Sequence, residues 1–407
     1  MRTPRIMKAP RISRWRPRRR DLLSITIVLA VIAALTLGKA VFVHRSSPPR
    51  TSTVSGAHSC GQDLNYTVPG ISGPPDDPLV VLLGVNSIPA ITQPRFESVQ
   101  NAQQWLPSDA PVITLALGGE VRAYPLAILE WHEVVDDTIG GLPVAITYCP
   151  LCNTAIVYDR RDGHSLLTLE TSGALDNGAL VLIDAASRQL WLQPSGAPLY
   201  KGSPLTWVPS GLMSLSDATH AYPHVVVLSR DTGFDRDYSA SPYGDVGGNG
   251  TALGFRGYYD ERIPPKTRVS GVVVDGRARA WQYSSLAQRH VVDDTVAGAP
   301  VVVFYDQAVS GIGDAADLGT APQVGATAVY QRTVAGRVLT FTPLGSDSAQ
   351  FRDRETGSVW DFTGRAVGGP LTGAQLTTIE HLDTYWFAWA AFYPGTSLDP
   401  PAPACTH

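Results

Sequence analysis

Residues 134–152 read VVDDTIGGLPVAITYCPLC, and residues 291–309 read VVDDTVAGAPVVVFYDQAV. The two runs share their apolar positions, their Asp-Asp-Thr and their glycine-containing turn, so the chain contains one unit twice. Only the first run carries Cys149 and Cys152, which face Asp306 and Val309 in the second. Residues kept in both copies are expected to serve the common fold. Residues present in one copy are candidates for a functional site.

The correspondence extends on both sides of these runs. Matching positions lie much farther apart than the roughly 20–50 residues of a solenoid repeat. The sequence therefore predicts two tandem copies of one unit. The other matching pairs are residues 119–124 with 276–281, 157–160 with 329–332, and 184–191 with 353–360.

Short apolar and β-branched runs separated by glycine turns dominate each copy, a pattern typical of antiparallel strands. The predicted fold is therefore α+β and β-rich: two tandem copies of a mostly antiparallel β unit, each with one or two short helices, behind an N-terminal membrane helix. The expected strands are residues 112–117, 144–148, 155–158, 166–169, 180–183 and 190–192; the expected helices are 126–135, 284–292, 215–222 and 381–392.

The N-terminus carries a membrane signal. The first twenty residues hold nine Arg and Lys and no acidic residue, and an apolar run follows from Leu22. Basic residues stay on the cytoplasmic side of a membrane helix, so we expect the main region outside the cytoplasm. A cleaved signal peptide ending near residue 40 and a twin-arginine signal are the alternatives. The position of the basic residues 1–20 directly before the apolar run explains their charge, so no nucleic-acid partner is expected.

The composition, 44% hydrophobic and 17% charged, is that of a globular protein. The predicted organisation has six parts: a basic cytoplasmic segment (1–21), a transmembrane anchor (22–43) that is the contact with the cell membrane, a tether (44–75), a first repeat (76–245), a diverged second repeat (246–400) and a C-terminal tail (401–407).

Two cysteines, Cys60 and Cys405, bracket the predicted folded region. An exported region lies in an oxidising compartment, and chain termini are often close in space. We therefore predict a Cys60–Cys405 disulfide, which leaves Cys149 and Cys152 as a self-contained pair.

The Cys149-Pro150-Leu151-Cys152 motif has three interpretations. It is a structural disulfide, a redox couple that requires a stabilised thiolate, or part of a metal site for zinc or copper. His132 and Glu133 are absent from the second copy and are the nearest additional candidates. The candidate catalytic residues are thus Cys149, Cys152, His132 and Glu133, and the candidate metal ligands are Cys149, Cys152 and His132.

The Asp136-Asp137 pair recurs as Asp293-Asp294. Paired carboxylates can act in acid–base catalysis, but recurrence in both copies and the glycine turn that follows favour helix-end or turn structure. We predict a structural role.

The chain resembles a family of uncharacterised prokaryotic proteins, domain of unknown function 3179. The resemblance rests on residues 131–137 and 143–152, with Arg122–Pro125, Asp159-Arg160, Arg236–Tyr238 and Pro242–Asp245. Asp136 stands where the family typically has Asn, and Val246 replaces an aromatic residue. The resemblance implies no particular activity.

Two hypotheses of function remain open. In the first, a membrane-anchored extracytoplasmic protein carries a thiol-based redox or metal-binding site in its first repeat. In the second, it is a non-catalytic extracytoplasmic binding or structural module with a structural Cys149–Cys152 disulfide. The substrate or ligand is not determined by the sequence.

Overall fold

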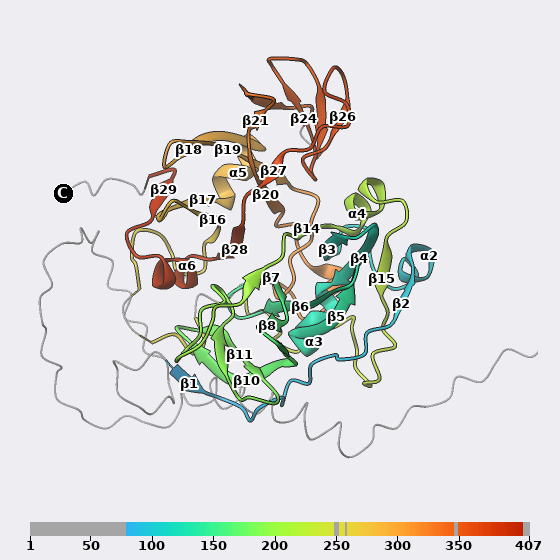
Figure 1. Cartoon of the computed structure of the whole chain (residues 1–407), viewed down its shortest axis with the longest axis vertical. Coiled ribbons are helices and arrows are strands. Elements are labelled where there is room, and N and C mark those ends of the chain that lie inside the picture. The colour runs from blue at the N-terminus through green and yellow to red at the C-terminus, as the bar shows by residue number, and fades with distance from the viewer. Residues whose placement is uncertain (1–78, 248–251, 257–258, 346–348, 402–407) are drawn as a thin grey trace, which may run out of the picture.

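The computed structural model describes residues 79–247, 252–256, 259–345 and 349–401. These residues form a β-rich α+β fold with few short helices and mostly antiparallel sheets (Figure 1). The predicted fold class is confirmed at this level. The predicted membrane segment, residues 22–43, and both cysteines of the predicted Cys60–Cys405 disulfide lie outside the described residues. No helix in the described part of the chain is long and apolar enough to cross a membrane.

The first half of the described chain builds three sheets and a hairpin. The five-stranded sheet has the order β14-β3-β4-β15-β2, and the four-stranded sheets have the orders β13-β7-β6-β5 and β1-β10-β11-β12. The elements are β1 (Leu79–Val81), β2 (Phe96–Ser98), α2 (Val99–Ala102), β3 (Pro111–Leu117), β4 (Glu120–Pro125), α3 (Leu126–His132), β5 (Val134–Ile139), β6 (Leu142–Cys149), β7 (Thr154–Asp159), β8 (Arg161–Asp162), β9 (Ser165–Leu166), β10 (Leu169–Asp176), β11 (Ala179–Asp184), β12 (Leu190–Leu192), β13 (Thr206–Trp207), β14 (Gly211–Ser214), α4 (Leu215–Ala221) and β15 (Val226–Leu228).

The second half largely repeats the order of elements that runs from β3 to β15, and it includes a hairpin of β21 and β22. Its four-stranded sheets have the orders β28-β16-β17-β29, β18-β19-β20-β27 and β23-β24-β25-β26. The elements are β16 (Arg268–Val274), β17 (Arg277–Gln282), α5 (Tyr283–Arg289), β18 (Val291–Val296), β19 (Ala299–Asp306), the 3₁₀ turn η2 (Leu318–Thr320), β20 (Ala326–Gln331), β21 (Thr333–Val334), β22 (Arg337–Val338), β23 (Phe341–Pro343), β24 (Gln350–Asp353), β25 (Val359–Asp361), β26 (Ala366–Gly368), β27 (Thr377–Thr378), β28 (His381–Tyr385), α6 (Trp386–Phe392) and β29 (Ser397–Asp399).

The recurring aspartates make the same contacts in both halves. Asp137 pairs with Arg122 as Asp294 pairs with Arg279. Tyr124 Oη donates to Asp137 at 2.7 Å, and the indole of Trp281 donates to Asp294 at 2.9 Å. The preceding aspartates each accept one backbone N–H: Asp136 from Leu169 and Asp293 from Phe341, both at 3.0 Å. These contacts tie neighbouring strands together, which supports the structural role predicted for the pairs.

The same aspartates correct one local expectation. Both pairs lie within the strands β5 and β18 rather than at a helix end or turn. The helix expected over 126–135 ends at His132, because Glu133 adopts a left-handed backbone conformation with φ 58° and the strand begins at Val134. The helix expected over 381–392 begins only at Trp386, since residues 381–385 form the strand β28.

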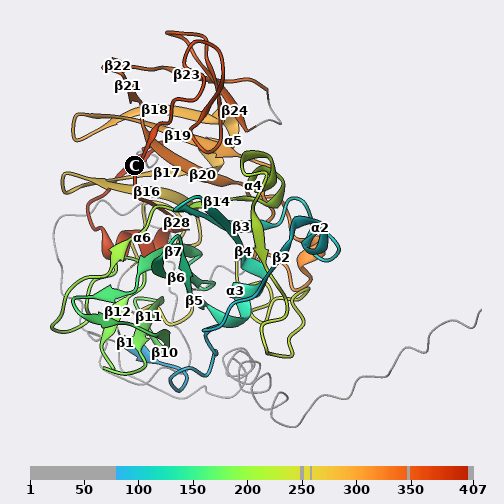
Figure 2. The same ribbon diagram turned by 45° about the vertical axis from the view of Figure 1, so that its right-hand side comes forward.

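The hydrophobic cores cross from one half to the other. One cluster of buried residues combines Cys149, Cys152 and Tyr158 of the first half with Trp386 and Trp389 of the second. In Figures 1 and 2 the two halves lie one above the other, with β7 near β28 and α6 at the seam. The two halves therefore stabilise each other. The division of the chain into repeats at residues 245/246 stays a prediction.

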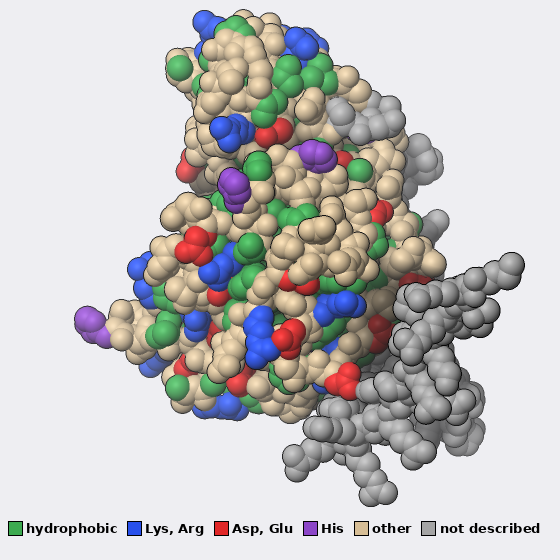
Figure 3. Space-filling view, turned by 90° about the vertical axis from the view of Figure 1, so that its right-hand side faces the viewer, with side chains coloured by type: hydrophobic (Ala, Val, Ile, Leu, Met, Phe, Trp, Pro, Cys, Tyr) green, Lys and Arg blue, Asp and Glu red, His purple; other side chains and the backbone are tan. Residues whose placement is uncertain are grey.

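One face of the molecule is shown as a surface in Figure 3. Basic and acidic side chains lie interspersed on this face, and no large patch of one sign of charge is visible there.

Candidate functional site

The cysteine motif is a turn between two paired strands. Strand β6 ends at Cys149, strand β7 begins at Thr154, and these two residues are register partners. Asn153 closes the turn in the left-handed region, with φ 56°, a conformation that Asn tolerates better than most residues. A strand rather than a helix follows the motif, as the sequence predicts. Both cysteines are free thiols and are buried, with Cys149 2% and Cys152 0% exposed.

A hydrogen-bond network orients the thiol of Cys152. Its Sγ lies 3.0 Å from Thr154 Oγ1. The Thr154 hydroxyl donates to Gln193 Oε1 at 2.7 Å, and Gln193 Nε2 donates to the Thr154 carbonyl at 3.2 Å. The Cys152 sulfur also lies 3.9 Å from the carbonyl of Cys149. Polar groups therefore contact this sulfur on two sides.

The second half of the chain covers the cysteine turn. The carbonyl of Cys152 accepts from the backbone N–H of Tyr385 at 3.0 Å and from the Thr384 hydroxyl at 2.8 Å. Lys266 Nζ donates to the carbonyl of Leu151 at 3.3 Å. The site is thus built between the halves and not by the first repeat alone.

Lys266 is the cation of this site. Its Nζ lies 4.3 Å from the centroid of the Tyr385 ring and 5.5 Å from that of Phe387. Burial lowers the pKa of Lys266 to about 8, although the charges of Cys152 and Cys149 act in the opposite direction and raise it. Within the described residues no carboxylate forms a salt bridge with Lys266. No sequence pattern pointed to this residue, because it lies in the segment before β16 and belongs to no motif.

The thiol of Cys149 is hard to ionise. Burial raises the pKa of Cys149 well above its ordinary value, and its hydrogen bond with the Cys152 side chain and the charges of Cys152 and Glu133 raise it further. The backbone N–H of Cys152 has the opposite effect on this pKa. When one sulfur of the pair ionises, the other is therefore expected to keep its proton.

Glu133 lies beside the cysteine turn, as the sequence led us to expect for a neighbour of the motif. Its carbonyl accepts from the backbone N–H of Tyr148 at 2.8 Å, and its carboxylate Oε1 accepts from the hydroxyl of Tyr243. Burial raises the pKa of Glu133 to about 7, against the opposing effect of the Tyr243 hydrogen bond. The positive φ at Glu133 is matched at His290, with φ 59°, so this backbone conformation belongs to the shared fold and only the carboxyl group is special to the first half.

A second buried carboxyl, Glu130, was not identified from the sequence. Burial raises the pKa of Glu130 to about 8, and the charges of Glu133 and Asp314 raise it while a hydrogen bond from Ser241 lowers it. In the second half, which lies across the seam from Glu130, Asp314 forms a salt bridge with Arg268. The Arg268 guanidinium also donates to Tyr385 Oη at 3.2 Å. The cysteine turn therefore has acidic groups on the Glu133 side and basic groups on the Lys266 side.

His132 is occupied elsewhere. Its Nδ1 lies 2.7 Å from the carbonyl of Pro89 and its Nε2 lies 2.8 Å from Tyr238 Oη. A carbonyl only accepts, so Nδ1 carries the proton and Nε2 accepts from the tyrosine. Burial lowers the pKa of His132 to about 4, although the hydrogen bond to Pro89 opposes this shift. Both ring nitrogens are used, so His132 has a packing role in this structure.

The structure gives no support to the metal interpretation. Among the residues that the structure describes, no three His, Cys, Asp or Glu side chains are grouped so that they could hold a metal ion. A site of Cys149, Cys152 and His132 would need a free histidine nitrogen, and the contacts of His132 leave none. Zinc or copper binding stays a prediction that metal analysis can test.

The second half carries a different buried group at the position of Cys149. Strand β19 ends at Asp306, and Val309 occupies the position of Cys152. Burial raises the pKa of Asp306 to about 7, and its interaction with Asp217 of α4 adds to this effect. The two halves thus have a similar backbone at this position but carry different functional groups.

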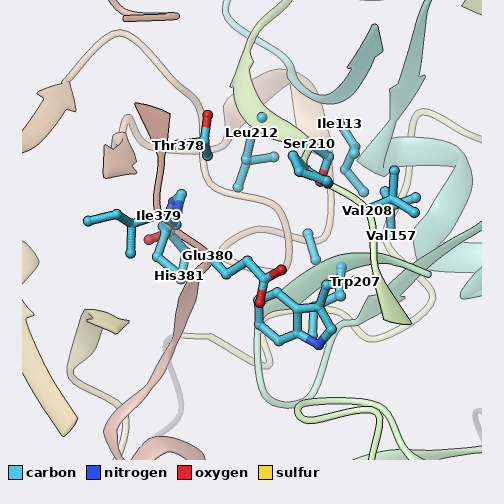
Figure 4. A pocket seen from close by; sticks show the side chains of 15 residues that line it. Ile113, Val157, Trp207, Val208, Ser210, Leu212, Thr378, Ile379, Glu380 and His381 are labelled. Atoms are coloured by element: carbon cyan, nitrogen blue, oxygen red, sulfur yellow. The ribbon is translucent and has the colours of Figure 1, made fainter. Parts of the chain in front are cut away.

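A separate pocket lies at the seam between β13–β14 and β27–β28. It encloses about 40 Å³ and is lined by Trp207, Ser210, Glu380 and His381, among others (Figure 4). None of Cys149, Cys152, His132 and Glu133 lines it. It is therefore distinct from the cysteine site.

The fold and the site define a class: a β-rich α+β protein of two similar halves, with a buried cysteine pair held at their seam. The chain belongs to the family described as protein of unknown function (DUF3179), whose model matches residues 85–396. The predicted family resemblance is confirmed. No curated protein and no solved structure matches the chain.

Proposed function

We propose that this protein is a membrane-anchored, extracytoplasmic thiol–disulfide redox protein whose working group is the Cys149–Cys152 pair. The observation that carries the proposal is the largely buried ammonium of Lys266, placed over the cysteine turn without a carboxylate salt bridge in the described part of the chain. A buried charge is expensive unless it is paired. A thiolate in the turn supplies that pair when the disulfide is reduced.

The redox step balances within the pair and one reaction partner. On oxidation, the two Cys–S–H bonds break and one S–S bond forms, which releases two electrons and two protons. A low-molecular-weight disulfide accepts them and becomes two thiols. In the reverse direction a low-molecular-weight dithiol reduces the pair. The burial of both sulfurs favours a small reaction partner over a protein.

Two features stabilise the reduced form relative to the disulfide. The Cys152 sulfur is hydrogen-bonded to Thr154 Oγ1, and formation of the disulfide removes this contact. The Lys266 charge attracts any thiolate of the pair but not a neutral disulfide. A stabilised reduced form makes a disulfide more oxidising. The pair is therefore expected to have a potential above the roughly −300 mV that marks structural disulfides.

The proposed location rests on the sequence. The basic residues 1–20 and the apolar run that follows favour an uncleaved anchor at residues 22–43, with the cysteine site outside the cytoplasm. An oxidising compartment supplies the conditions in which a dithiol can cycle.

The test is a redox titration of the purified soluble region in dithiothreitol buffers, followed by acid quenching, alkylation in denaturant and mass spectrometry. We expect one reversible two-electron transition at Cys149–Cys152. The Lys266→Met variant should shift the potential by about 20–40 mV to more negative values, for a charge pair worth about 1–2 kcal/mol. Lys201→Met, which removes an exposed lysine, is the matched control and should leave the potential unchanged.

The burial of both sulfurs also favours the alternative function, a non-catalytic binding or structural module in which the pair is an inert disulfide. A disulfide that stays oxidised until the protein unfolds would support that function and overturn the redox proposal. Stoichiometric zinc or copper that is lost from Cys149→Ser would instead establish a metal site.

A further inference from the structure

A cavity of about 70 Å³ lies beside the cysteine turn, apart from the seam pocket. Its walls are mostly aliphatic and come from three parts of the first half and from the segment that follows it. Leu82 and Leu83 belong to the segment after β1, Leu151 to the cysteine turn, Leu175 and Leu180 to the β10–β11 sheet, and Leu253 to the following segment.

The cavity is a built feature of the fold. The pairing of β10 with β11 shifts register between Thr171 and Leu175. At the shift, the carbonyl of Gly173 accepts the backbone N–H groups of both Leu82 and Leu83, at 2.9 and 3.0 Å. Gly173 has φ +78°, and a Cβ there would lie 2.2 Å from the carbonyl oxygen of Leu83. Glycine is therefore required for the segment after β1 to close over the sheet and form the cavity wall.

The lining contains three polar side chains, Glu133, Thr171 and Tyr243. The Thr171 hydroxyl donates to the carbonyl of Ile88 at 3.0 Å, and the Tyr243 hydroxyl donates to Glu133 Oε1. Glu133 is 5% exposed, and the Tyr243 hydrogen bond is made to its Oε1. The cavity is thus lined by one largely buried carboxyl group, and its Oε2 is the oxygen that a ligand can contact.

The charges around this oxygen favour a cation. No Lys or Arg is among the residues that line the cavity. The titratable groups that interact with Glu133 are Glu130, Cys149 and Tyr243, all acidic. Burial raises the pKa of Glu133 to about 7, so the group is largely ionised at pH 8. A carboxylate in an aliphatic wall is unfavourable unless a cation pairs with it.

We propose that this cavity binds a short alkyl monoamine, with its apolar body among the leucines and its ammonium group on Glu133 Oε2. The volume limits the size of the ligand. One water needs roughly 10–15 Å³ on this measure, so a cavity of about 70 Å³ has room for about five heavy atoms, the size of n-butylamine. This site does not depend on the redox proposal, because neither sulfur lines the cavity.

The test is calorimetric titration of the purified soluble region with n-butylamine and with n-butanol, a neutral ligand of the same size. At pH 8 we expect the amine to bind at least about tenfold more tightly than the alcohol. Between pH 8 and pH 6 the ionised fraction of a carboxyl with a pKa of about 7 falls by roughly tenfold. Amine affinity should fall by about the same factor, and alcohol affinity should not change.

Two variants separate the carboxylate from the cavity. Glu133→Gln should remove the preference for the amine, while Ala174→Leu fills the cavity and should abolish binding of both ligands. Ala186→Leu, at an exposed alanine, is the control and should bind as the natural protein does. If Glu133→Gln does not fold, the pH comparison and Ala174→Leu still decide the question.

Equal affinity for amine and alcohol, no binding of either ligand, amine affinity that is unchanged by pH, or amine binding that survives Ala174→Leu would each overturn the proposal. The redox titration is a separate measurement, so its failure would leave this result intact.

Discussion

Replacement of Lys266 by methionine should make the protein more stable at neutral pH and change its redox behaviour. Lys266 has a pKa of about 8 in the folded protein against an ordinary value of 10.5, because burial disfavours its charged form. Each tenfold change in an ionisation equilibrium corresponds to about 1.4 kcal/mol. Holding the ammonium in the fold at pH 7 therefore costs roughly 3 kcal/mol relative to the neutral amine.

The direction of the Lys266 pKa shift sets the pH range over which the charge destabilises the fold. The folded pKa lies below the unfolded one, so between about pH 8 and 10.5 the unfolded chain binds more protons than the folded chain. The cost is fully present below about pH 8 and disappears as the pH rises towards 10.5. Methionine has a similar length and no charge. Lys266→Met should thus raise the free energy of unfolding by about 2–3 kcal/mol at pH 7, and by progressively less towards pH 10.5.

Urea unfolding at pH 7 and at pH 10 measures this difference, in proteins that also carry Cys149→Ser and Cys152→Ser so that no thiolate can pair with Lys266. Lys201→Met is the control, because Lys201 is exposed, and should change the free energy of unfolding little at either pH. A Lys266→Met protein that is less stable than the natural one at pH 7, or equally stabilised at both pH values, would refute the reasoning. A stabilising change that also shifts the redox potential would show that the lysine is retained for chemistry at the expense of stability.

Four further outcomes are expected. Asp137→Ala removes a buried partner of Arg122 and Tyr124 and should lower the free energy of unfolding by about 3–5 kcal/mol. Asp294→Ala, at a more exposed pair, should lower it clearly less. Urea unfolding measures both changes, and redox titration should find the Cys149–Cys152 transition unchanged in both variants. Asp306→Asn should stabilise the protein at pH 8 and not at pH 4, because a carboxyl whose folded pKa is raised to about 7 destabilises the fold once it must ionise; thermal melts at the two pH values measure it. Mass spectrometry of the unreduced exported protein should find Cys60 bonded to Cys405, and protease accessibility from the outer side should find the main region extracytoplasmic; two free thiols or a protected main region would contradict these expectations.

The fold could be predicted from the sequence to a large extent, because its signals are local. Alternating apolar residues and glycine turns indicate strands within a few residues of each other, and the matching runs at 134–152 and 291–309 indicate two similar units. The errors lie at boundaries. The pattern at 381–392 is apolar throughout, so periodicity alone could not separate β28 from α6, whose division is set by the pairing of β28 with β16.

The cysteine pair and Glu133 could also be selected from the sequence, because they differ between two copies that otherwise match. The residues that surround the cysteine pair and Glu133 could not be predicted from the sequence. Thr384 and Cys152 are 232 residues apart, and Lys266 and Leu151 are 115 apart, and no local pattern carries such contacts. His132 met the same sequence criterion as Glu133, but Pro89 and Tyr238 already occupy both of its ring nitrogens. The sequence by itself determined the repeated strands and the residues that differ between copies. Only the packing of one half on the other decided which of those residues share a site, because burial, charge pairing and hydrogen-bond satisfaction depend on groups that meet only in the folded chain.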